Sequence, residues 1–375
     1  MTIDNENGCK KLNSFTVNDI YTNTGLEFTG TTILCTGGLN GFFEGMTTGT
    51  VQNTGNAAAM AFFAGVEFAN LEFIQYHPTT VSISGKRMLV SEAARGEGGR
   101  LFVMKNNSRY YFMEEKYPKL GNLMPRDVIS REMALLHKDG LGPFFLDMTG
   151  IDGKTWNTRL SDLRDEVISY LGTNPAKEPV AVSPGIHYFM GGIRVDDNHR
   201  TNVEELYAAG EAACKYHGAN RLGGNSMLGA FYGGRTAALD ICKNPKVNAS
   251  VREIVVDPEE SFPALRRKAC ALLFDALGII RSEASLKKAI ADLDSIKTGK
   301  IGKTDSMRLE FGKAMLLSAL ERKESRGAHY REDYPKTKDN YRKQTCVTYS
   351  DGTISISFKE PVHSFEDNPE KEDVL

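Results

Sequence analysis

Apolar positions along the first half of the chain switch between strand-like runs and helical spacing. The run 31–35 stops abruptly at Gly37-Gly38, which predicts a strand followed by a turn close to a ligand. Residues 53–69 are rich in alanine, with Phe, Met and Val at helical spacing, and predict a tightly packed helix after a glycine turn. The more polar stretch 81–184, with a helix predicted after Pro125, is expected to form an inserted domain.

Glycines return after residue 185, and a second set of elements follows. The pattern predicts a strand at 206–209 that leads into Gly210-Glu211, and then a helix over 226–241. Residues 258–325 contain three helical patterns, and Ser282 is the expected N-cap of the second. The charged tail from 336 predicts one short strand pair around 346–358.

Composition narrows the class of protein. Hydrophobic residues make up 41% and charged residues 25% of the 375 residues, which is ordinary for a globular protein of two or three domains. The formal net charge of -2 gives no basic excess to neutralise phosphates, so nucleic acid is not an expected partner. The six cysteines show no metal-ligand spacing and are expected to be buried free thiols, with no metal site. The polar start and the lack of a membrane-length apolar run predict a cytoplasmic protein.

Four segments set histidines and arginines beside glycine or proline turns. Two histidines and two arginines so placed can surround a small anion with cationic donors, which indicates a dicarboxylate site. Taken alone, a histidine such as His77 is more typical of a satisfied core imidazole than of a ligand-binding group, and His137, His199 and His363 are expected at the surface. The segments are QYHPT at 75–79, SEAARGEGG at 91–99, PRDV at 125–128, and HYFMGG at 187–192 paired with HGANRLGGNS at 217–226.

Arg126 breaks a local rule of helix formation. It falls in the first turn of a predicted helix, where the helix dipole disfavours a cation by about 0.3–1 kcal/mol. Violations of this kind tend to mark function. The alternative is an arginine that merely pairs with Asp127 or Glu92 at the surface.

The order and spacing of these segments resemble the flavoprotein subunits of succinate dehydrogenase and fumarate reductase, and also L-aspartate oxidase. The similarity runs from about residue 25 to Pro335, where SRGAHYREDYP at 325–335 resembles the family's helical domain. The resemblance implies an α/β fold: a partial Rossmann-like FAD-binding domain, an inserted α+β capping domain and a C-terminal helical bundle. The expected bounds are 1–80 with 185–250 for the FAD-binding domain, 81–184 for the capping domain, 251–335 for the helical domain and 336–375 for a C-terminal tail.

The resemblance also implies a reaction, a cofactor and roles for individual residues. FAD would exchange a hydride with a C4 dicarboxylate, fumarate or succinate, while Arg126 gives or takes the proton at the neighbouring carbon through a relay of Glu92 and Arg95. The substrate carboxylates would be held by His77, Ser91, His187 and Arg221, with Ser91 in place of the family's usual threonine. The expected FAD contacts are Gly37, Gly38, Asn56, Glu211, Ser226 and Met227, with Asn56 in place of the more usual aspartate.

Part of the family pattern is not found in this sequence. No G-x-G-x-x-G follows an N-terminal strand, so we expect the first part of the FAD-binding domain to be missing, and a separate N-terminal polypeptide carrying it is a candidate partner. An iron–sulfur electron-transfer subunit is another candidate partner, which would hold the protein at the inner face of a membrane. Two alternatives stay open: an L-aspartate oxidase, favoured by FFLDMT at 144–149 but not by 221–226, and a non-catalytic remnant or scaffold subunit.

Overall fold

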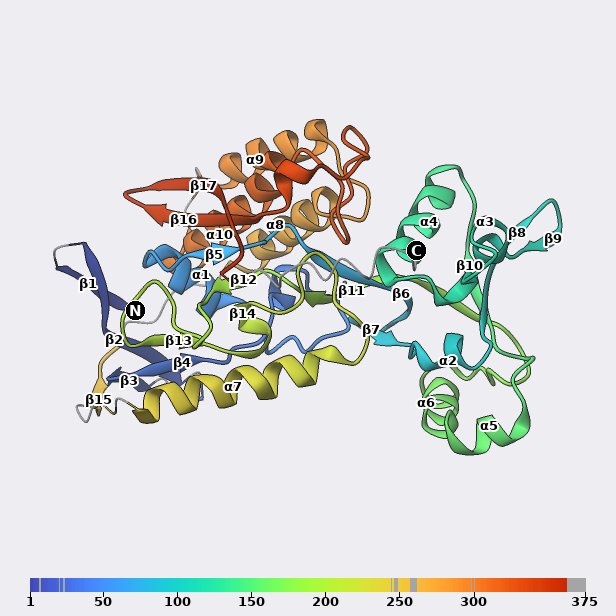
Figure 1. Cartoon of the computed structure of the whole chain (residues 1–375), viewed down its shortest axis with the longest axis horizontal. Coiled ribbons are helices and arrows are strands. Elements are labelled where there is room, and N and C mark those ends of the chain that lie inside the picture. The colour runs from blue at the N-terminus through green and yellow to red at the C-terminus, as the bar shows by residue number, and fades with distance from the viewer. Residues whose placement is uncertain are drawn as a thin grey trace.

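The protein has two lobes, a larger body and a smaller lobe, which we call the cap (Figure 1). The residues of the cap's hydrophobic core lie between Val81 and Val182. The structure is a computed structural model that describes residues 1–362, except 7, 20, 23, 244, 246–248, 257–261, 298 and 300. Two long paired strands, β6 (Ile74–Ile83) and β11 (Val180–Phe189), run from the body into the cap. No helix in the described part of the chain is long and apolar enough to cross a membrane.

The N-terminal side of the body holds an antiparallel sheet and a short parallel strand pair. Strand β4 (Thr32–Leu34) pairs in parallel with β13 (Leu206–Ala208). Because parallel strands end at the same edge, the turns that follow them, at 37–38 and 210–211, lie side by side. The antiparallel sheet has the order β1-β2-β3-β15, with β1 at Thr2–Glu6, β2 at Cys9–Asp19, β3 at Thr24–Thr29 and β15 at Ser250–Ile254.

A five-stranded sheet forms the centre of the body, in the order β14-β12-β5-β16-β17. The strand pair predicted in the charged tail belongs to it, because β16 pairs with β5. Helix α1 (Asn56–Phe63) packs against α10 (Lys303–Glu321) and β16, over a core that includes Phe62, Phe68 and Phe311. The strands are β14 (Ala213–Cys214), β12 (Gly192–Arg194), β5 (Phe68–Ala69), β16 (Gln344–Ser350) and β17 (Thr353–Lys359).

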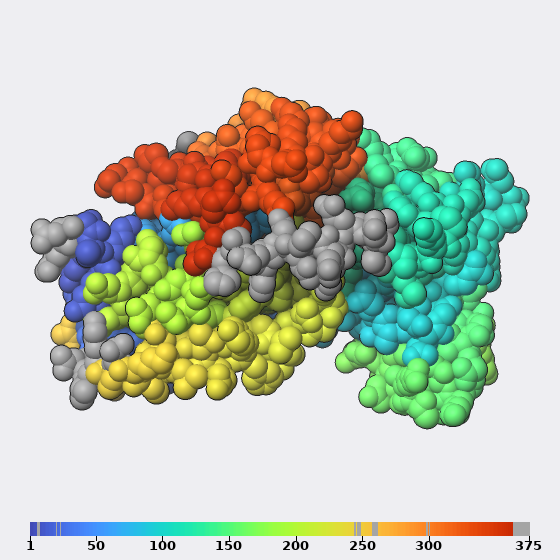
Figure 2. All heavy atoms as spheres, viewed as in Figure 1, coloured from blue at the N-terminus to red at the C-terminus, as the bar shows by residue number. Residues whose placement is uncertain are grey.

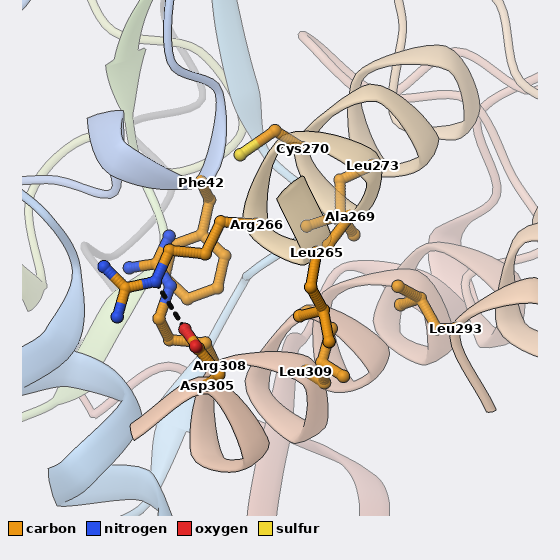
Figure 3. A pocket seen from close by; sticks show the side chains of 11 residues that line it. Phe42, Leu265, Arg266, Ala269, Cys270, Leu273, Leu293, Asp305, Arg308 and Leu309 are labelled. Carbon is orange, nitrogen blue, oxygen red and sulfur yellow. Dashed lines mark hydrogen bonds and ion pairs between the residues drawn. The ribbon is translucent and has the colours of Figure 1, made fainter. Parts of the chain in front are cut away.

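Three helices, α8 (Pro263–Ala276), α9 (Glu283–Ile296) and α10, cover the body on the side away from the N-terminal sheet (Figure 1). Ser282 caps α9 as predicted, since its hydroxyl accepts a hydrogen bond from the Ser285 amide at 3.2 Å. The crevice between these helices is narrow and is lined by residues that include four leucines and the Arg266–Asp305 ion pair (Figure 3).

A long helix, α7 (Asn225–Lys243), runs along the surface of the body beneath the parallel strand pair (Figure 2). Three of its large apolar side chains, Met227, Leu228 and Phe231, are 62–71% exposed. The first half of α7 therefore presents apolar side chains to its surroundings.

The cap has a sheet and a hydrophobic core of its own. Its sheet continues β6 and β11 in the order β7-β6-β11-β10-β8-β9, antiparallel throughout. Leu101, Ile129 and Trp156 are among the residues of its core. The remaining elements are β7 (Lys86–Leu89), β8 (Arg100–Lys105), β9 (Ser108–Tyr110), β10 (Phe144–Asp147), α2 (Ala93–Gly96), α3 (Phe112–Lys116), α4 (Arg126–Lys138), α5 (Gly153–Thr158) and α6 (Ser161–Leu171).

Three sequence predictions are wrong in the structure. The helix predicted over 53–69 ends at Phe63, because Gly65 adopts a positive φ of 88° and the Val66 amide bonds back to the Ala61 carbonyl, closing a Schellman turn. His199 is buried, with Nδ1 2.7 Å from the Ala208 carbonyl oxygen, whereas His137 is exposed as expected and His363 lies outside the described residues. All six cysteines are unpaired, but Cys9, Cys35 and Cys242 are exposed.

Candidate active site

The strand pair that links body and cap carries two histidines. His77 on β6 and His187 on β11 have ring centroids 5.4 Å apart. The register of the pair shifts between Ile186 and Tyr188, so His187 sits in a bulge that changes the direction of its side chain. Its Nδ1 lies 2.7 Å from the Thr48 hydroxyl, which comes from a loop of the body.

A network joins two buried arginines through one partly exposed carboxylate. Arg126, at the first position of α4, donates from Nη2 to Glu92 Oε2 at 2.9 Å. The other oxygen of Glu92 accepts from Arg95 Nη2 at 2.8 Å. The Arg126 and Arg95 side chains are only 8% and 1% exposed, whereas that of Glu92 is 39% exposed. The surface pairing considered for Arg126 is therefore wrong: the partner is Glu92, but the arginine is buried.

The third arginine comes from the body. Arg221 follows the segment HGAN and lies with its guanidinium carbon 4.4 Å from the centroid of the Tyr188 ring. The neighbouring Gly223 lies directly against the network, since a Cβ there would come within 2.3 Å of Glu92 Oε2 and 3.2 Å of Arg126 Nη2. A side chain at position 223 would have to displace the Glu92 carboxylate, so the segment 221–224 and the cap meet at Glu92.

One glutamine that received no role from the sequence connects these parts. Gln75 is fully buried and accepts from Arg126 Nη1 at 3.0 Å through Oε1. Its Nε2 donates to the Arg221 carbonyl at 2.7 Å and to Asn220 Oδ1 at 2.9 Å. Strand alternation could have indicated it, because Gln75 and His77 are two residues apart and share a face of β6.

Burial and nearby arginines keep both histidines neutral. Burial, together with the charges of Arg126 and Arg221, lowers the pKa of His187 to about 3. Burial and the positive charges of Arg126 and Arg95 lower the pKa of His77 well below its usual value. For Glu92, burial opposes ionisation, but the hydrogen bonds and charges of Arg126 and Arg95 outweigh it and lower its pKa. The cluster thus has three guanidinium charges against one carboxylate.

Several buried donors in this cluster have no hydrogen-bond partner among the described residues. They are His77 Nε2, Arg95 Nε and Arg221 Nε. The Thr79 amide donates to His77 Nδ1 at 3.3 Å, which assigns the proton of the neutral ring to Nε2. Buried donors are normally paired, and each unpaired one costs roughly 1–3 kcal/mol. Unpaired buried donors of this kind are expected where an anion that accepts hydrogen bonds can bind.

The residues expected at the flavin lie on the body side, near the parallel strand pair. Gly38 has no room for a side chain, because a Cβ would come within 2.5 Å of Glu211 Oε1. The same oxygen accepts from the Phe189 amide at 2.9 Å, and burial raises the pKa of Glu211 to about 7. Gly37 has a positive φ of 72°. This cradle of glycine backbone around a carboxyl group fits a cofactor that approaches the main chain closely and offers hydroxyl groups.

Four other predicted residues also have defined positions, which say less about function. Ser226 and Met227 lie in the first turn of α7, where a helix N-terminus favours an anionic group. The Asn56 side-chain oxygen accepts from Arg308 Nη1 at 2.8 Å. Ser91 begins the turn before α2, and its hydroxyl accepts from the Ala93 amide at 3.3 Å. The structure thus brings His77, Glu92, Arg95, Arg126, His187 and Arg221 into one cluster, with Ser91 beside it.

Fold and site define a class of protein: an α/β protein with a cap, in which buried histidines and arginines gather where cap and body meet. A family model described as FAD binding domain matches residues 6–227, and one described as Fumarate reductase flavoprotein C-term matches 300–373. The chain therefore belongs to the FAD-dependent oxidoreductase family of succinate dehydrogenase and fumarate reductase flavoproteins, and its cofactor is FAD. The family and the cofactor expected from the sequence are confirmed.

Relatives from two branches of the family are similar to the chain. It is 33% identical to the succinate dehydrogenase flavoprotein subunit of Bacillus subtilis, over 82% of this chain and 60% of that protein. It is 34% identical to the L-aspartate oxidase of Mycobacterium leprae, over 85% and 61%. A quinol fumarate reductase variant of E. coli has a TM-score of 0.77 at 25% identity, over 97% of this chain and 71% of that one. The chain thus spans about three fifths of the length of the curated relatives it matches.

Proposed function

We propose that the chain carries the dicarboxylate site of an enzyme that interconverts fumarate and succinate, with Arg126 as the group that moves the proton. The observation that supports this most strongly is the Arg126–Glu92–Arg95 network, whose two arginines are buried, set beside two neutral histidines and Arg221. The proposal assigns the binding of substrate carboxylates to His77, Ser91, His187 and Arg221.

The charge of the cluster suits a dianion. Three guanidinium groups and the Glu92 carboxylate leave two positive charges among groups that are mostly buried. A C4 dicarboxylate carries two negative charges and eight lone-pair sites on its carboxylate oxygens, enough for all three unpaired donors. Because both histidines are neutral, they donate hydrogen bonds without adding charge. A monocarboxylate would leave one positive charge uncompensated in a poorly solvated place.

Proton movement follows from the relay. When bound, FAD supplies or accepts the hydride at one methylene carbon of the substrate. At the neighbouring carbon, Arg126 gives a proton in fumarate reduction and takes one in succinate oxidation. A free arginine holds its proton tightly, so transfer requires a partner that replaces the proton at once. Glu92 Oε2 is such a partner at 2.9 Å from Nη2: the carboxylate passes to Arg126 a proton that it receives through Oε1 from Arg95. Because the Glu92 side chain is 39% exposed, solvent supplies the proton that returns the relay to its starting state, and succinate oxidation runs the same path in reverse.

L-Aspartate oxidation is a second candidate. An aspartate oxidase is as similar in sequence as the succinate dehydrogenase subunit. The Glu92 side chain is 39% exposed and is the one carboxylate of the cluster, so it could also pair with a substrate ammonium group. Because the Bacillus relative is named as a subunit, we further propose that the chain works with an electron-transfer partner, for which an iron–sulfur protein is the first candidate.

The test is a comparison of substrates on the flavin-loaded protein. Succinate should reduce the flavin and fumarate should reoxidise it, whereas L-aspartate should leave the absorbance near 450 nm, about the wavelength of oxidised flavin absorption, unchanged. Bleaching by aspartate but not by succinate would establish the second candidate instead. A flavin-loaded protein that responds to none of the three and binds no dicarboxylate would indicate a scaffold subunit.

A further inference from the structure

Residues 41–54 form a loop whose two ends lie together and whose tip reaches the site. The Gly41 amide donates to the Asn53 carbonyl at 2.9 Å, and a Cβ on Gly41 would come within 2.4 Å of the Thr54 oxygen. Compact loops with closed ends of this kind are held by their own contacts and are frequently functional. We call 41–54 the site loop, because Thr48 at its tip contacts His187.

The tip is anchored to the strand that carries His187. The Thr48 amide donates to the Ile186 carbonyl at 2.9 Å, and the Ile186 amide donates to the Met46 carbonyl at 3.1 Å. The Thr48 hydroxyl lies 2.7 Å from His187 Nδ1. A ring nitrogen engaged in this way fixes the tautomer and orientation of the imidazole. The position of the site loop thus decides how His187 faces the substrate.

The neck of the site loop is held by one arginine from the helical layer. Arg308 on α10 donates to the carbonyls of Gly41, at 2.6 Å, and of Thr54, so it binds both limbs of the neck at once. It also donates to Asn56 Oδ1 at 2.8 Å and lies 4.3 Å from the centroid of the Phe42 ring. Its side chain is buried, and its hydrogen bonds within the described residues all go to neutral oxygens of this segment.

We infer that Arg308 is a positioning residue for dicarboxylate binding: by clamping the neck of the site loop it holds Thr48 against His187. The inference rests on the proposed function, because His187 matters only if it binds the substrate. A guanidinium suits this task since its planar fork reaches several carbonyls in fixed geometry, which a lysine cannot do. The simpler role, that Arg308 only joins α10 to the body, makes different predictions.

The neighbouring Arg266 provides a matched control. It lies in the same crevice as Arg308 and is also a guanidinium of the helical layer, but it pairs with Asp305 at 2.5 Å (Figure 3). No hydrogen bond from Arg266 to the site loop is found within the described residues. Replacing Arg266 therefore disturbs the crevice and the helices without releasing the neck.

The first measurement is amide hydrogen exchange, which needs no substrate. In Arg308→Met the amides of 41–54 should exchange faster than in the wild type, most clearly at Thr48, and Arg308→Lys should restore part of the protection. Arg266→Met should leave exchange in 41–54 unchanged. Equal protection of Thr48 in wild type and Arg308→Met would overturn the clamp.

The second measurement is malonate binding by calorimetry on flavin-loaded protein. Arg308→Met should weaken binding about fivefold, the effect of losing one ordinary hydrogen bond that orients His187. Thr48→Val should do the same, and the double variant should be no weaker than either single one, because both act through one contact. Additive losses, or an unchanged affinity despite faster exchange, would overturn the positioning role. If wild-type protein binds no dicarboxylate while exchange responds as expected, the proposed function fails and the clamp stands.

Discussion

Replacement of Arg126 by alanine tests the central proposal most directly. The variant loses the two hydrogen bonds from Arg126 to Glu92 and the one to Gln75. Among the described groups of the cluster, Arg126 alone donates to Glu92 Oε2, so this oxygen is left without a donor. Removal of a general acid or base costs about 10²–10⁴-fold in rate, equivalent to about 3–5 kcal/mol of transition-state stabilisation. We expect fumarate reduction to fall by that factor.

Stability must be separated from this loss of rate. Gln75 is fully buried, and without Arg126 its Oε1 loses the partner found in the structure, which costs roughly 1–3 kcal/mol of folding stability. Glu92 keeps Arg95, so the carboxylate itself stays paired. Rates are therefore normalised to bound flavin, and unfolding is followed separately by heat denaturation.

The matched control for Arg126→Ala is Arg131→Ala on the same helix. Arg131 lies 4.0 Å from Asp127 in its ion pair and is partly exposed, away from Glu92. The assay is reoxidation of a reduced dye by fumarate, with malonate affinity measured alongside. Arg131→Ala should keep nearly the full rate. If an Arg126→Ala preparation with bound flavin keeps more than about a tenth of the wild-type rate, where loss of a general acid predicts 10²–10⁴-fold, the proton does not pass through Arg126.

Three further changes test the anion site, its glycine and the flavin side. Arg221→Met should weaken malonate binding, measured by calorimetry, about 10–100-fold, which is the value of a charge-assisted hydrogen bond. An unchanged affinity would show that Arg221 does not bind the anion. Gly223→Ala should lower turnover, because the added Cβ would meet Glu92 Oε2. The control Gly234→Ala should leave turnover unchanged, since there is open space around its Cβ. Equal activity of the two variants would contradict the close approach of Gly223 to Glu92. The folded-state pKa of Glu211 is raised from 4.5 to about 7, so ionisation of this carboxyl lowers the stability of the flavin-free protein as the pH rises from 4.5 to 7. Over that pH range the melting temperature of Glu211→Gln should therefore fall less than that of the wild type. Parallel melting curves for the two proteins would refute the burial effect.

The sequence determined the family and the kind of chemistry. Motifs such as 75–79 and 217–226 consist of side chains and turn residues whose order is visible without any structure. Local rules also worked where the controlling contacts are local. Ser282 caps α9 through a hydrogen bond with a residue three positions away. The predicted helix over 53–69 was too long because the apolar pattern was followed past Gly65, although a glycine there is itself a local helix-stop signal.

Burial of individual side chains was decided by the tertiary structure. His199 has the sequence context of a surface histidine, yet its Nδ1 meets the Ala208 carbonyl and its Nε2 contacts the Tyr216 hydroxyl. Cys35 follows an apolar strand and was expected to be buried, but it is exposed. Exposure depends on which element covers a residue from outside, and a neighbour distant in sequence leaves no local pattern.

The same reason explains why the supporting residues of the site were missed. Gln75 meets Arg126 across 51 residues, Thr48 meets His187 across 139, and Arg308 meets Asn56 across 252. Each is an ordinary polar residue in its own segment, and only the folded chain gives it a partner. The sequence by itself thus determined which groups can do the chemistry, and the packing of body, cap and helices decided which polar residues hold those groups in place.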